Sequence, residues 1–308
     1  MTALDRSGAA YNRITLRCVS IALLLFLAGC STVRLEQFSQ FAAAGQTYTA
    51  ALPKLLDIAL QSTIEASSTE LIEIRGQISD PDERANILDA SDKEIRRRVQ
   101  AFQVIKTQTN LLGAYFMGLA ALAESDAGEG IAKSTLDAAE ALDKIGKGAA
   151  TLKIGEAPVK DVLGDIVPIV VAAFNRARLE EVLETTAESV GRSIDIHIAL
   201  LEQLSVVIRG EQEVVLGTTK LKEVDRKYRD AGALPAKWKT RRAELLLKQA
   251  RLGELEEALK AAQKLKLAFV DLVENENSST SLTLLLQDMQ RLTSLAELIS
   301  GKGQIEGE

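Results

Sequence analysis

The sequence predicts an all-α protein, built as an elongated antiparallel bundle of long, coiled-coil-like helices. Three observations support this prediction. Apolar residues recur at spacings of three and four rather than two, which is the periodicity of an α-helix. Only 4% of the residues are aromatic and only 5 are prolines, whereas the strands and turns of all-β proteins use both freely. No signature recurs with a period of about 20–50 residues, so a solenoid is not expected.

The first thirty residues carry a targeting signal. Three arginines and a single acid precede a short apolar run from Val19 to Leu27. A basic stretch followed by an apolar run of this length is typical of a secretory signal and is too short for a stable membrane span. The run closes on Leu27-Ala28-Gly29-Cys30, which closely resembles the lipobox of bacterial lipoproteins. That resemblance implies cleavage before Cys30 and attachment of acyl chains such as palmitate to it.

The resemblance also implies a location. The second residue of the mature chain is Ser31 rather than Asp, which in bacteria with two membranes implies sorting to the outer membrane. We expect a chain tethered there by lipid, on the periplasmic face rather than the cell surface. Removal of the signal peptide, residues 1–29, leaves one elongated helical domain of 279 residues, 30–308, with a formal charge of −8. Because Cys18 is removed and Cys30 is acylated, no free thiol is left for a disulfide or for catalysis.

Six helices are expected in the mature chain. Their ranges are 34–78, 82–126, 131–152, 158–230, 236–274 and 280–299. Asp80 offers an N-cap to a helix whose first residue is Pro81. Glycines and polar residues mark the later breaks. Pro53 and Pro168 fall inside two of the ranges, where each should kink or split its helix.

The ranges 158–230 and 236–274 are predicted to form a helical hairpin, 158–274, that turns near Pro235. One apolar stripe runs from Leu179 to Ile208 over about eight turns of helix. If 158–230 is continuous, it extends about 110 Å at 1.5 Å per residue. The segment Ala231-Gly232-Ala233-Leu234-Pro235 is typical of a helix–helix turn, so the helices on either side should return antiparallel.

The turn of this hairpin concentrates positive charge. Between residues 220 and 242, nine bases stand against three acids, so this window has a net charge of +6 and the rest of the mature chain −14. The candidate contact residues are Arg226, Lys227, Arg229, Lys237, Trp238, Lys239, Arg241 and Arg242. Trp238 is the only tryptophan, and Tyr228 lies in the same window. Basic residues interleaved with aromatics suit phosphorylated lipid headgroups or an acidic partner. A solvated helix end without a partner is the alternative.

The sequence shows no constellation typical of catalysis, of a metal site or of a cofactor. His197, the only histidine, lies on the apolar stripe between Ile194 and Leu201, where a buried histidine with one hydrogen-bond partner is expected. An envelope hydrolase would need a nucleophile beside a base, and neither is evident. One His and two Cys cannot complete a zinc or iron–sulfur site. A net charge of −6 gives no general attraction to nucleic acid.

We therefore expect a non-catalytic, outer-membrane-anchored lipoprotein that acts as a structural or adaptor component of the cell envelope. Its expected partners are envelope proteins or an anionic surface, and the sequence favours no particular oligomeric state. The alternative is a membrane-active protein. Two apolar blocks, 111–122 and 162–174, flank a short Ala-rich helix, an arrangement that resembles the hydrophobic tongue of helical pore-forming toxins. Neither block reaches the ~20 residues needed to span a bilayer, so both are equally compatible with a buried core.

Overall fold

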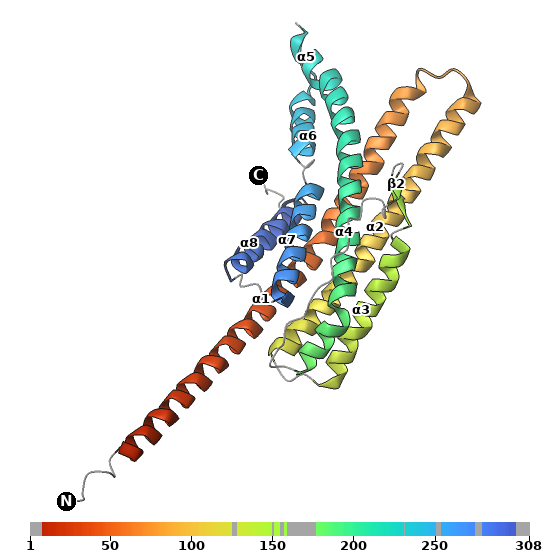
Figure 1. Ribbon diagram of the computed structural model, residues 1–308. Helices are drawn as coiled ribbons and strands as arrows, with labels where there is room; N and C mark the ends of the chain where they lie inside the picture. Colours follow the sequence, from red (N-terminus) through yellow and green to blue (C-terminus); the bar gives the residue numbers. More distant parts are fainter. Residues whose placement is uncertain are drawn as a thin grey trace, which may run out of the picture.

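The protein is all-α, as the apolar spacing predicts, in a computed structural model of the chain (Figure 1). The structure describes residues 8–124, 128–149, 151–154, 157–158, 177–230, 232–250, 254–274 and 279–299, and it describes the backbone alone for residues 8–34, 153–154, 157–158, 211, 250, 254, 279–281 and 298–299. The helices are α1 (Gly8–Arg75), α2 (Pro81–Glu124), α3 (Glu129–Ala149), α4 (Ala177–Lys220), the π-helical turn η2 (Leu221–Asp225), α5 (Arg226–Arg229), α6 (Trp238–Ala250), α7 (Glu254–Glu274) and α8 (Ser279–Ile299). Two short strands, β1 (Lys153–Ile154) and β2 (Ala157–Pro158), pair antiparallel.

The start of α2 follows the predicted capping chemistry. The backbone N–H of Asp82 donates to Asp80 Oδ1 at 3.0 Å, and Pro81 is the first helical residue. This arrangement satisfies an otherwise unpaired N–H at the helix start. Pro53 lies inside α1, which continues beyond it to Arg75. The helix is therefore not split at Pro53.

Three of the expected helix ranges differ from the structure by more than a few residues. Helix α1 begins at Gly8 rather than near residue 34. Pro158 pairs with Lys153 in the β1–β2 ladder, so the expected start of a helix at residue 158 is wrong. Proline has no N–H and a fixed φ, which suits the edge of a strand as well as a first helical turn. Pro168 and the rest of 159–176 lie outside the described residues. The expected helix 236–274 is described as α6 and α7, and residues 251–253 between them also lie outside.

The contacts between helices fix their directions. Ser67 of α1 lies 2.7 Å from Ser91 of α2 (Oγ to Oγ), and Ser39 donates to Glu124 at the other end of the pair, so α1 and α2 run antiparallel. Helices α3 and α4 run in parallel instead. Asp143 approaches Arg192, and Gly146, almost one turn later, approaches Ile196.

Phe41 joins the two layers of the core. Its ring meets Phe116 of α2 edge-on at 5.6 Å and stacks on Phe269 of α7 at 5.8 Å. Helices α1 to α4 form one layer, and α7 with α8 covers the face made by α1 and α4. All three rings are fully buried. One continuous core therefore connects the N-terminal helices with the C-terminal pair.

The molecule is elongated along α1 (Figure 1). Helix α1 extends beyond the bundle at its N-terminal end, whereas α5 and the turn between α1 and α2 lie at the opposite end. Cys30 falls within α1, in the part of which only the backbone is described. From Cys30 to Arg75, α1 covers roughly 65–70 Å at 1.5 Å per residue. The hairpin turn near Pro235 therefore lies far from Cys30.

Candidate functional site

The charged turn is the end of an antiparallel helical hairpin. Near the turn, Trp238 Nε1 donates to the Val224 carbonyl at 3.1 Å, and far from it Lys266 pairs with Asp195 at 2.7 Å. Residue numbers therefore fall along α4 as they rise from α6 to α7. The structure thus places the positive charges of residues 220–242 together at one end, and we call these residues the basic tip.

Trp238 and Tyr228 hold the basic tip together. Their rings stack with centroids 5.5 Å apart and planes 22° from parallel. Val224, the acceptor of the Trp238 hydrogen bond, is buried. Opposite these groups, Lys220 pairs with Asp225 across the π-helical turn η2 at 3.1 Å. Trp238 therefore packs within the tip and stabilises it. The composition of residues 220–242 alone does not predict this structural role.

Six of the eight predicted contact residues present uncompensated charge. They are Arg226, Lys227, Arg229, Lys237, Lys239 and Arg242, all exposed. Within the part of the chain that the structure describes, none of their side chains has a hydrogen-bond or ion-pair partner. Arg241 differs, because it pairs with Glu223 and Glu244, and its hydrogen bond to Glu223 raises its pKa. The tip is therefore a cationic surface supported by one internal ion-pair network.

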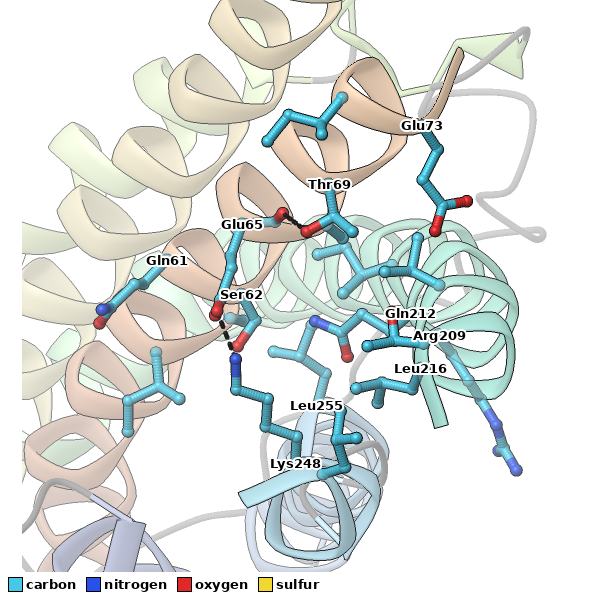
Figure 2. A pocket seen from close by; sticks show the side chains of 18 of the residues that line it. Gln61, Ser62, Glu65, Thr69, Glu73, Arg209, Gln212, Leu216, Lys248 and Leu255 are labelled. Carbon is cyan, nitrogen blue, oxygen red and sulfur yellow. Dashed lines mark hydrogen bonds and ion pairs between the residues drawn. The ribbon is translucent and has the colours of Figure 1, made fainter. Parts of the chain in front are cut away.

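A groove lies beneath the basic tip (Figure 2). Its volume is about 870 Å³, and its walls come from α1, from α4 with η2, and from α6 with the start of α7. The apolar lining consists of Ile58, Ala59, Ala66, Ile72, Ile208, Val215, Leu216, Leu245 and Leu255. Small-molecule sites typically measure about 300–1,000 Å³. The two long walls of the groove lie more than a hundred residues apart in the chain, so no local sequence pattern predicts it.

Ion pairs close the rim of the groove. Lys248 extends from α6 to Glu65 of α1 (Figure 2), and Lys222 pairs with Glu73 at 3.0 Å. These contacts tie the basic-tip hairpin to α1 and neutralise the rim. The lining residues include no His or Cys. The groove therefore offers apolar surface bordered by charges, of which Lys248–Glu65 and Lys222–Glu73 are paired, and its lining also includes hydroxyl groups.

His197 lies in the core and faces other polar groups. It is 1% exposed, and its ring centroid lies 6.0 Å from that of Tyr48. Within the described residues neither of its nitrogens has a hydrogen-bond partner, and the Tyr48 hydroxyl and the Gln108 amide also lack one. The predicted burial is confirmed, but the expected partner of His197 is not found among the described residues. Burial lowers the pKa of His197 to about 3, so the ring is neutral.

This position gives His197 no chemistry to perform. A general base needs a pKa near the working pH and access to a substrate, and His197 has neither. Among the described residues, no group of three or more His, Cys, Asp or Glu side chains is placed to hold a metal ion. Gln108 is a buried polar residue on the apolar stripe of α2, and like His197 it could be recognised in the sequence by its place on such a stripe.

The first apolar block belongs to the core. Within 111–122, the buried side chains are Leu112, Tyr115, Phe116, Leu119 and Leu122. The Tyr115 hydroxyl lies 3.0 Å from Thr186 Oγ1, so this block is fixed to α4. The second block, 162–174, lies outside the described residues. Among the helices whose side chains are described, from Leu35 onward, none is long and apolar enough to cross a membrane.

Comparisons with protein-family models, with curated proteins and with solved structures found no significant match to the chain.

Proposed function

We propose that this protein is a non-catalytic lipoprotein of the bacterial outer membrane, anchored by acyl chains on Cys30 and facing the periplasm. In this proposal it acts as an adaptor of the cell envelope, and its basic tip binds an acidic surface on another envelope component. The lipobox at Leu27-Ala28-Gly29-Cys30 supports the anchor. The elongated bundle supports an adaptor, because α1 spans roughly 65–70 Å from Cys30 to Arg75 at 1.5 Å per residue, and the basic tip lies at the same end of the molecule as the turn between α1 and α2.

The observation that carries the proposal is that most cationic side chains of the basic tip have no ion-pair partner among the described residues. Charges on an exposed helix are commonly neutralised by acids three or four residues away, as Arg192 is by Glu188 at 2.8 Å. Six cations of the basic tip have no such partner among the described residues. A concentrated charge of one sign accelerates association with a surface of the opposite sign and selects against other surfaces. The tip is thus suited to an anionic partner.

The membrane-active alternative has less support. It requires block 111–122 to leave the core, where Tyr115 and Phe116 are fully buried. Exposing two buried aromatic side chains costs about 3 kcal/mol or more. We therefore retain the adaptor as the proposed function.

The anchor is tested by replacing Cys30 with Ser. We expect the wild-type chain to incorporate labelled palmitate and to fractionate with outer membranes. The Cys30→Ser chain should incorporate no palmitate. It should either keep its signal peptide or be cleaved at another site by a different peptidase, and in the second case it should appear in the soluble periplasmic fraction. Palmitate incorporation by Cys30→Ser would contradict the proposed anchor.

The basic tip is tested by recovery of partners from detergent extracts. The tip variant replaces Arg226, Lys227, Lys237 and Lys239 with Gln, and the matched control replaces Arg96, Lys133 and Lys144, exposed cations on α2 and α3 that have no partner in the described structure. We expect recovered partners to fall at least about tenfold with the tip variant and to remain with the control. Equal recovery by both variants would remove the tip from the proposed function.

A further inference from the structure

The turn between α1 and α2 carries charge opposite to that of the basic tip. Residues 70–89 contain six acids against Arg75 and Arg84, a net charge of −4. We call these residues the acidic tip. Both tips lie at the end of the molecule opposite the N-terminus (Figure 1). Glu70, Asp82, Glu83 and Asp89 are exposed, and none has an ion-pair partner among the described residues.

The acidic tip also contains an apolar hollow. Its volume is about 360 Å³. The apolar lining consists of Leu71, Ile74, Ile78, Pro81, Ala85, Ile87 and Leu88. Leu88 is 49% exposed, so this surface reaches solvent. Arg75 and Arg84 also line the hollow, whereas the six carboxylates of the acidic tip are not among its lining residues. The acidic tip thus combines an apolar hollow with a separate, carboxylate-rich surface.

The basic tip has the complementary form. Tyr228 is 67% exposed and Leu234 is 44% exposed. Both lie within the window that carries the six unpaired cations. The basic tip thus combines exposed apolar side chains with unpaired cations, and its net charge is opposite to that of the acidic tip, which also exposes apolar surface.

Within one molecule, the charges of the basic and acidic tips are mostly not neutralised by ion pairs between the two tips. Lys222 and Glu73 pair at 3.0 Å at the base of the tips, and beyond them no hydrogen bond or ion pair joins the two tips in the described residues. Each tip ends a long helix, α1 or α4, that is packed into the core for much of its length. Closing the tips on each other would require bending these helices, whereas a second molecule can approach both tips without deforming either.

We propose that the acidic surface bound by the basic tip is the acidic tip of a second copy of this chain. This inference rests on the proposed function, in which the basic tip binds an acidic protein surface. The pairing is reciprocal, because a two-fold axis places each basic tip on the other copy's acidic tip. An anionic bilayer fits less well, because the acidic tip at the same end would be repelled.

The contact is expected to be weak in solution and sensitive to salt. Each tip is small beside the roughly 800 Å² per partner of a standard interface. Exposed charges are screened over about 8 Å at physiological ionic strength. Anchoring of both copies in one membrane raises their effective concentration and offsets this weakness.

The test is a charge exchange between tips, using the full lipidated chain purified in detergent. The basic-to-acidic variant replaces Arg226, Lys227, Arg229, Lys237 and Lys239 with Glu. The acidic-to-basic variant replaces Glu70, Asp82, Glu83 and Asp89 with Lys. The control variant reverses Arg96, Lys133 and Lys144. Light scattering measures the protein mass at 50 mM and 500 mM salt, and circular dichroism verifies that each variant is folded.

We expect the wild type and the control to form dimers at 50 mM salt and to dissociate at 500 mM salt. Each tip variant alone should be monomeric, with an association constant at least about tenfold lower. A mixture of the two tip variants should restore the dimer, because each contact again joins opposite charges. This restoration is independent of any loss of stability in a single variant.

Three results would overturn the inference: a monomeric wild type at both salt concentrations, a dimer that persists in both tip variants, or a mixture that stays monomeric. Partner recovery from extracts separates this inference from the proposed function. If the acidic-to-basic variant still recovers an envelope protein and the tip-neutralised variant does not, the partner is a different protein. The proposed function then stands and the self-association fails.

Discussion

Tyr228 and Trp238 stack across the basic tip with ring centroids 5.5 Å apart, and Trp238 also donates to the Val224 carbonyl. Trp238 is the only tryptophan of the chain. Its fluorescence therefore reports on the tip alone, while circular dichroism reports on the helices of the whole protein. The structure thus provides a separate probe for the site that the proposed function depends on.

The first prediction concerns the charge around this probe. Six unpaired cations near Trp238 should concentrate anions locally. For each quencher, the efficiency on Trp238 is divided by the efficiency on free tryptophan. We expect this ratio to be at least about twofold higher for iodide than for neutral acrylamide, and lower for caesium than for acrylamide. The difference should fall in 0.5 M salt, because the Debye length then shrinks below about 5 Å. Equal relative quenching by all three agents would contradict the cationic tip.

The second prediction compares a buried apolar contact of α6 with an ion pair of the same helix. Leu245 is 3% exposed, whereas Lys248 makes a partly exposed ion pair with Glu65. Replacing Leu245 with Ala removes buried apolar surface and should destabilise the segment by about 2–5 kcal/mol. Exposed ion pairs contribute about 0–1 kcal/mol. Amide exchange in residues 238–249 should therefore accelerate far more in Leu245→Ala than in Lys248→Met, and the reverse order would contradict this.

The third prediction concerns acid stability. Burial lowers the pKa of His197 to about 3, whereas an unfolded histidine titrates near 6.5. The unfolded chain therefore binds a proton between these values that the folded chain does not, so stability falls as the pH drops below about 6.5. At pH 5 the loss is about 2 kcal/mol. Tyr48, whose ring lies 6.0 Å from that of His197, carries no compensating charge, because burial raises its pKa.

The measurement is urea unfolding of the wild type and of His197→Leu at pH 7.5 and pH 5. Carboxylates affect both chains alike, so the difference between them isolates His197. We expect the wild type to lose about 2 kcal/mol more than the variant between the two pH values. The same pH dependence in both chains would show that the ring is not buried in its neutral form.

The sequence predicts the helices better than their arrangement. The capping pair Asp80 and Pro81 starts α2 as expected, because capping depends on neighbouring residues alone. The stripe from Leu179 to Ile208 is buried as expected. The parallel course of α3 and α4 was not predicted, because it depends on where the chain between them runs. Helical periodicity fixes a buried face but not the neighbour that covers it.

The same distinction between local sequence features and long-range contacts applies to the candidate site. The positive charge at residues 220–242 is visible in the sequence, but which cations are paired depends on contacts such as that of Arg241 with Glu223 across the hairpin. The groove and the acidic tip were missed for a similar reason. Both become sites only when α1 is placed beside α4 and α2.

The fourth prediction tests the close approach of α2 and α3. A Cβ atom on Gly118 would overlap Thr135 Oγ1, whereas one on Gly217 would meet open space. We expect Gly118→Ala to destabilise the fold by about 1–3 kcal/mol through overpacking. Gly217→Ala should be neutral or stabilising by up to about 1 kcal/mol, since Ala favours a helix. Chemical denaturation followed by circular dichroism measures both, and an equal response of the two glycines would contradict the packing.

The most direct test of the proposed function is photo-crosslinking in intact cells from a probe at position 239. Lys239 is exposed on the basic tip, and Lys144, exposed on α3, provides the matched control position. The account predicts a protein adduct from position 239, carrying either a second copy or another envelope protein. This adduct should disappear when Arg226, Lys227 and Lys237 are neutralised, and position 144 should not give it. No adduct from position 239, or the same adduct from both positions, would contradict an adaptor that acts through its basic tip.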